Sequence, residues 1–103
     1  AEALYYNAYF KNQEGQYKSS NTVVQKLAKD YSGYKLYGAK GLVIMAKNFY
    51  ALGDAYQATY ILESVIENFA EFTDVVDEAK TELRKIKSEQ AKTNASVDTD
   101  NGN

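Results

Sequence analysis

The chain has 103 residues, of which 45% are hydrophobic and 25% are charged, and its formal net charge is −2. This length suits one small domain or a piece of a larger one, and a charge so close to neutral gives no sign of a nucleic-acid surface. Histidine and cysteine are absent, which excludes His-based acid/base catalysis, Ser-His and Cys-His nucleophile pairs, disulfides and nearly all zinc sites.

Proline is absent as well, which is compatible with long uninterrupted helices. Few stretches alternate apolar and polar residues with a period of two, so we expect almost no sheet. No apolar run approaches the roughly 20 residues that a membrane-spanning helix needs. The chain has no initiator methionine and begins inside a predicted helix, so we expect a processed or truncated product of a longer chain.

The spacing of apolar residues predicts a helix over residues 2–13 and a second over about 16–31, with a turn at Gly15 between them. Residues 34–37 are predicted to form a short aromatic connector. A third helix is predicted over about 38–52.

A fourth helix is predicted over about 54–69, with Gly53 ending the preceding helix and Asp54 capping this one. A fifth, over about 74–90, has a narrow apolar stripe and charged residues on its other sides, as expected at the end of a stack. Residues 92–103 contain few apolar side chains, and we predict a disordered polar tail there.

The first predicted pair of helices repeats in the second pair after a shift of 38 residues. The matched pairs include Leu4 with Leu42, Ala8 with Ala46, Gly15 with Gly53, Val24 with Leu62 and Tyr31 with Phe69. A further shift near 37 places Leu42, Ala46 and Phe49 on Ala79, Leu83 and Ile86. The chain therefore reads as about two and a half copies of one helical hairpin.

The second copy resembles a tetratricopeptide repeat (TPR). It reads Leu42-x-x-Met45-Ala46-x-x-Phe49 and then Ala58-x-x-x-Leu62, with Ala70 where the family has proline. The resemblance implies an all-α, right-handed α-solenoid of antiparallel hairpins with five helices. The domain would cover 1–91, with repeat 1 at about 1–34, repeat 2 at about 38–72 and a terminal helix at about 74–90.

The repeat also departs from the TPR pattern, because its period is about 38 residues where the family has 34. The longer junctions carry aromatic residues, Tyr34 and Phe72. In this respect the chain resembles TPR proteins of bacterial cell envelopes, of the outer-membrane assembly lipoprotein and Tol–Pal-associated types. That resemblance favours the bacterial periplasm or cell envelope over the cytoplasm.

In TPR stacks the first helix of each hairpin lines a concave surface, and the resemblance carries this role to particular positions here. The partner-binding residues it implies are Tyr5, Tyr9 and Asn12 in the first copy, Val43, Lys47 and Tyr50 in the second, and Lys80, Arg84 and Lys87 in the last helix. Tyrosine offers a large contact area with a polar tip, and Lys and Arg pair with carboxylates of acidic peptides or chain termini. The alternatives are that the tyrosines are half-buried packing residues and that the basic residues form a solvated face with i,i+4 ion pairs.

From this pattern we expect a protein–protein interaction module that binds a peptide or partner helix, with no catalysis, cofactor or metal. We expect no nucleic-acid partner and no direct insertion into a membrane. The alternative is a structural segment of a longer solenoid, or a scaffold of an envelope complex that self-associates as a weak homo-oligomer.

Overall fold

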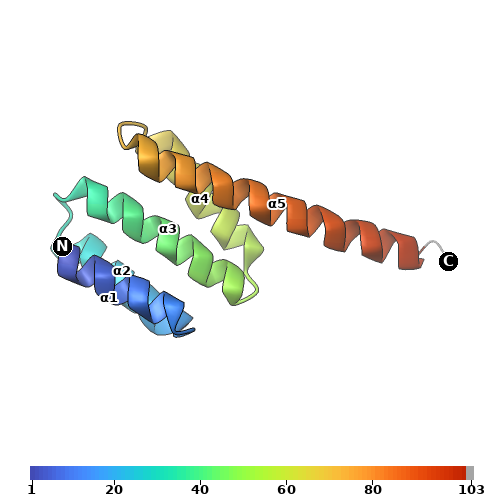
Figure 1. Ribbon diagram of the computed structural model, residues 1–103, viewed down its shortest axis with the longest axis horizontal. Coiled ribbons are helices and arrows are strands. Elements are labelled where there is room, and N and C mark those ends of the chain that lie inside the picture. Colours follow the sequence, from blue (N-terminus) through green and yellow to red (C-terminus); the bar gives the residue numbers. More distant parts are fainter. Residues whose placement is uncertain (102–103) are drawn as a thin grey trace.

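The computed structural model describes the backbone of residues 1–101 and the side chains of residues 1–93. Within this part of the chain there are five helices and no strand, which confirms the predicted all-α class (Figure 1). The helices are α1 (Glu2–Gln13), α2 (Tyr17–Asp30), α3 (Lys35–Ala51), α4 (Ala55–Asn68) and α5 (Thr73–Asn101). No helix of the described residues is long and apolar enough to cross a membrane.

The turns inside the two hairpins have the same hydrogen bonds at a spacing of 38 residues. The amide of Gln16 donates to the carbonyl of Lys11 over 2.8 Å, and the amide of Asp54 donates to that of Phe49 over 2.8 Å. Gly15 and Gly53, at φ values of 79° and 89°, supply the left-handed residue that this type of helix ending requires. The repeat seen in the sequence is therefore a repeat of backbone structure.

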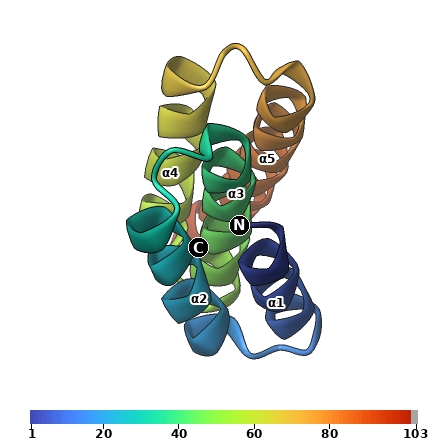
Figure 2. The ribbon, with the colours of Figure 1, turned by 90° about the vertical axis from the view of Figure 1, so that its left-hand side faces the viewer.

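Helix α3 lies in the middle of the molecule and packs against each of the other four helices. Figure 2 shows it between the α1–α2 hairpin on one side and α4 and α5 on the other. This position explains why α3 has buried residues in two different clusters, with Val43 in one and Ile44 in the other.

The core consists of two clusters that meet at α3. The larger joins α3, α4 and α5 through residues such as Val43, Leu62 and Ile86. The smaller joins α1, α2 and α3 through Ala8, Val24 and Ile44. Small residues stand where the two helices of each hairpin come closest, and they are fully buried: Ala8 and Ser20 in the first hairpin, Ala46 and Ala58 in the second.

Ser20 replaces the alanine of the second hairpin without leaving a buried polar group unsatisfied. Its hydroxyl donates a hydrogen bond of 2.7 Å to the backbone carbonyl of Ala8. A buried hydroxyl costs stability only when it lacks a partner, so serine is tolerated at this close contact.

A chain of three asparagine side chains ties the two hairpins together. Asn48 of α3, fully buried, donates to the Oδ1 atom of Asn21 in α2 over 2.8 Å. Its own Oδ1 atom accepts a hydrogen bond of 2.8 Å from the Nδ2 atom of Asn12 in α1. The contact between hairpins is therefore partly polar and directional.

The structure corrects one predicted boundary and extends another. Residues 35–37, predicted as part of an aromatic connector, form the first turn of α3, because the carbonyl of Tyr34 accepts from the amide of Gly38 and Tyr37 packs on Tyr5. The helix predicted over about 74–90 continues to Asn101. The disorder predicted for 92–103 stays a prediction, since the side chains of 94–103 and the backbone of 102–103 lie outside the described residues.

We expect Asn48→Ala to lower the free energy of unfolding by about 1–3 kcal/mol, because it leaves the carboxamides of Asn21 and Asn12 without their partner. Urea unfolding followed by circular dichroism measures the change. The control is Asn68→Ala, an exposed residue of α4, for which we expect a change within about 0.5 kcal/mol. Equal effects of the two substitutions would contradict the role given to Asn48.

Two glycines of α3 provide a matched test of how closely α2 approaches it. A Cβ atom at Gly41 would lie 3.2 Å from Leu27 Cδ2 and 3.3 Å from Val24 Cγ1, whereas one at Gly38 would meet nothing within 4 Å. Alanine at either position gains up to about 1 kcal/mol of helix propensity. We expect Gly38→Ala to be more stable than the wild type by this amount in thermal unfolding. The free energy of unfolding of Gly41→Ala should be about 1–3 kcal/mol lower than that of Gly38→Ala, because the added methyl group overpacks a buried contact.

Candidate partner-binding groove

Side chains of four helices, α1, α2, α3 and α5, surround a hollow of about 380 Å³, here named the α1–α5 groove. Asn12, Lys47 and Tyr50, all predicted partner-binding residues, line it. The other lining residues are Gln13, Tyr17, Ala51, Glu82 and Lys85. The first helix of each hairpin and the last helix therefore contribute side chains to one surface.

Two contacts across α3 and α5 border the groove. Lys47 Nζ lies 2.9 Å from Glu78 Oε1, and the Tyr50 hydroxyl donates a short hydrogen bond to the Glu89 carboxylate. This hydrogen bond, more than burial, raises the pKa of Tyr50 above its usual value. Both contacts orient long side chains of the predicted set, and the ion pair neutralises the Lys47 ammonium.

Of the three residues predicted on α1, Asn12 lines the groove, whereas Tyr5 and Tyr9 do not. Tyr5 is half-buried, and its loss of solvent raises the pKa of its hydroxyl. The Lys40 ammonium lies 4.7 Å from the centre of the Tyr5 ring. Tyr5 is therefore engaged within the fold, as the packing alternative predicts, while Tyr9 is 38% exposed.

Val43 does not belong to this surface. It is 2% exposed and is part of the core cluster of α3, α4 and α5. Position 43 has the same helical phase as Lys47 and Tyr50, but α5 packs against α3 and covers it. A buried valine offers no area to a partner.

Lys80, Arg84 and Lys87 lie on a different flank of α5 from the groove. Lys87 Nζ is 3.6 Å from Glu63 Oε1 of α4, and the residues that reach α3 or line the groove are Glu78, Glu82, Lys85 and Glu89. The two sets differ by an offset of two residues, which turns a side chain by about 200° around a helix. The placement predicted for the basic residues is therefore corrected: the α5 side of the groove is mainly acidic, with one lysine.

The sequence pattern left this choice open because the apolar stripe of α5 has charged residues on both sides. Helical periodicity determines which side of α5 is buried, but the rotation of α5 against α3 determines which charged flank borders the groove. Spacing gave no signal, because Lys80, Arg84 and Lys87 follow the same intervals of four and three residues as the positions of α3.

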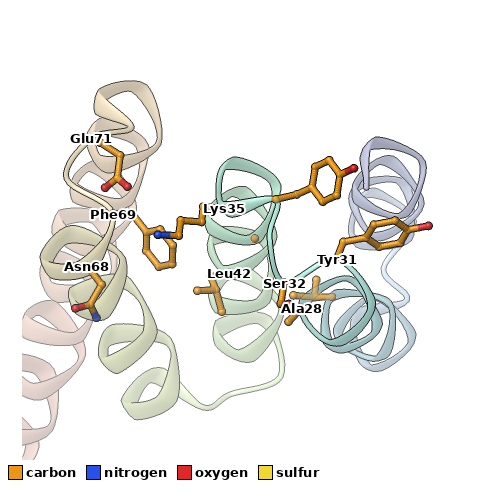
Figure 3. Close-up of a pocket in the computed structure, with 11 residues that line it drawn as sticks. Ala28, Tyr31, Ser32, Lys35, Leu42, Asn68, Phe69 and Glu71 are labelled. Carbon is orange, nitrogen blue, oxygen red and sulfur yellow. The ribbon is translucent and has the colours of Figure 1, made fainter.

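A second hollow, of about 410 Å³, lies at the ends of the hairpins between α2, α3 and α4 (Figure 3). Its walls are mostly apolar, and Figure 3 shows Phe69 and Ala28 on opposite sides of it, with Leu42 between them and Lys35 extending toward Phe69. It contains none of the predicted site residues.

Comparisons with protein-family models, with curated proteins and with solved structures find no match to this chain. Among the residues that the structure describes, no three carboxylates, histidines or cysteines are grouped in a way that could hold a metal ion. The arrangement of the groove itself is therefore the basis for the functional proposal.

We expect the contact between α3 and α5 to weaken as the pH rises above about 10, the ordinary pKa of tyrosine. The folded-state pKa of Tyr50 is raised, so the stability that its proton contributes is complete below the unfolded-state pKa and is lost as the pH rises through the folded value. Thermal unfolding measured from pH 8 to 11 should fall less steeply for Tyr50→Phe than for the wild type. Parallel curves would show that the hydroxyl of Tyr50 makes no such contribution.

Proposed function

We propose that this chain is a TPR-like protein–protein interaction module that binds a peptide or a partner helix in the α1–α5 groove, without catalysis. The observation that carries the proposal is that α1, α3 and α5, together with Tyr17 of α2, contribute long polar and aromatic side chains to one hollow. A surface made by several separate elements suits an extended or helical ligand better than a small molecule.

The groove offers three kinds of recognition. The amide side chains of Asn12 and Gln13 can donate and accept hydrogen bonds with a peptide backbone. The rings of Tyr17 and Tyr50 provide contact area with few torsions to freeze. The ammonium of Lys85 has no carboxylate within 4.0 Å among residues 1–93, which makes it the cation of the groove available to an acidic group.

The surrounding charges favour a partner that carries both signs. Glu82 lines the same hollow as Lys85, and Glu78 and Glu89 are already engaged by Lys47 and Tyr50. A uniformly acidic peptide would meet these three carboxylates as well as the lysine. We therefore propose a peptide with an acidic residue near Lys85 and a hydrogen-bonding backbone over α1.

A scaffold role is a second candidate, and one observation favours it. Tyr6 and Phe10 on the outer side of α1 are 46% and 56% exposed, so the molecule also presents aromatic area away from the groove.

The groove is tested by Lys85→Glu combined with Gln13→Ala, two exposed positions that line the groove and leave the core untouched. We expect the double variant to keep the circular dichroism spectrum and thermal midpoint of the wild type but to lose the proteins recovered by affinity purification from the source cells. Truncation or reversal of central contacts commonly costs tenfold or more in affinity, by about 1–3 kcal/mol. Quantitative mass spectrometry of the recovered proteins measures the loss.

The matched control is Arg84→Glu, which reverses a charge one residue away on the flank of α5 that does not border the groove. We expect it to recover the same proteins as the wild type. Loss of the same proteins with Arg84→Glu, or unchanged recovery with the double variant, would place the binding surface elsewhere.

A further inference from the structure

Helix α1 has apolar residues on two opposite sides, but only one side is covered. Leu4 and Ala8 face the interior, whereas Tyr6 and Phe10 are exposed on the other side. Helix α2, its partner in the hairpin, is apolar on its inner side only and carries residues such as Lys18, Thr22 and Lys29 outward. Helix α3 also has two apolar sides, and both of them are packed.

The 38-residue repeat identifies what the bare side of α1 corresponds to in α3. Ala3, Tyr6 and Phe10 are equivalent to Gly41, Ile44 and Asn48. All three of those α3 residues are buried by the first hairpin. Gly41 lies under Leu27 and Val24, Ile44 clusters with Ala8 and Val24, and Asn48 bonds to Asn21. The bare side of α1 is thus the counterpart of an interface that the molecule forms elsewhere.

Exposure alone does not lead to this conclusion, as two tyrosines of α4 show. Tyr56 and Tyr60 are 79% and 64% exposed, more than Tyr6 and Phe10. Their equivalents 38 residues earlier are Lys18 and Thr22, which are exposed on α2. The repeat therefore marks Tyr56 and Tyr60 as ordinary surface and singles out the side of α1.

We infer that the outer face of α1, formed by Ala3, Tyr6, Asn7 and Phe10, is a second interaction surface that binds an amphipathic helix of another polypeptide. This helix takes the position on α1 that α2 takes on α3. The surface is separate from the α1–α5 groove, so the inference does not rest on the proposed groove function.

The dimensions of the face define the helix that fits it. Opposite Phe10 the helix carries a small residue where α2 has Asn21, because a phenyl ring replaces the carboxamide of Asn48. Ala3 has a Cβ atom where its equivalent in α3, Gly41, has none. A Cβ atom at Gly41 would be 3.2 Å from Leu27 Cδ2, so the helix carries a residue smaller than leucine opposite Ala3. A branched aliphatic residue at the position of Val24 packs against Tyr6.

A second copy of this chain offers no such helix among residues 1–93. The apolar faces of α2 and α4 are already buried, with Val24, Leu27, Leu62 and Val65 at most 2% exposed. The apolar stripe of α5 is covered by α3 and α4. The outer face of a second copy's α1 carries Tyr6 and Phe10, which are larger than the residues that fit, so residues 1–93 of a second copy do not supply the occupant.

The probe is a helix-stabilised synthetic peptide with the sequence of residues 16–31, carrying Asn21→Ala and Leu27→Ala to fit Phe10 and Ala3. Fluorescence anisotropy of the labelled peptide is titrated with the full chain. We expect saturable binding to the wild type, binding at least about tenfold weaker with Phe10→Lys, and unchanged binding with the matched control Tyr60→Lys. A peptide that also carries Val24→Asp should not bind.

Three results would overturn the inference. The first is no saturable binding to the wild type, and the second is an equal loss of binding with Tyr60→Lys. The third is self-association of the chain without peptide, measured by light scattering and abolished by Phe10→Lys, which would make a second copy the occupant. Lys85→Glu should leave peptide binding unchanged, which separates this surface from the groove.

Discussion

The buried carboxamide of Asn48 holds the two hairpins in one relation to each other. It donates to Asn21 and accepts from Asn12, so one side chain of α3 bonds to both helices of the first hairpin. The apolar cluster around it is small, with Ala8, Val24 and Ile44 as its buried members. Apolar contacts tolerate sliding, whereas a buried amide loses its partners when the helices shift, so the polar chain sets the register.

The same chain of amides connects the interior to the groove. Asn12 is held in place by the hydrogen bond that it donates to Asn48, and it also lines the hollow beside Lys47 and Tyr50. The contacts of α3 with Glu78 and Glu89 are at the surface, where ion pairs contribute about 1 kcal/mol or less. They orient the groove, while the packing of Ala79 and Ile86 holds α5 in place.

Much of the fold was predictable because local rules and the repeat agree. The hairpin turns at Gly15 and Gly53 and the small residues Ala46 and Ala58 follow from spacing alone. The aromatic connector was a wrong prediction for residues 35–37, because the packing of Tyr37 on Tyr5 joins residues far apart in the chain. Of the groove residues, Asn12, Lys47 and Tyr50 were identified from sequence, because their phase in α1 and α3 follows from the repeat.

The sequence by itself determined the helices, their pairing into hairpins and which side of each helix is apolar, because these depend on a period of 3.6 residues and on turn chemistry. Only the tertiary structure decided how α5 is rotated on α3, and hence that Val43 is buried and that Lys85, not Lys80 or Arg84, borders the groove. It also decided that Asn48 finds two partners and that the second apolar side of α1 stays bare. Such relations depend on the volumes and hydrogen bonds of residues far apart in the chain, which no local pattern records.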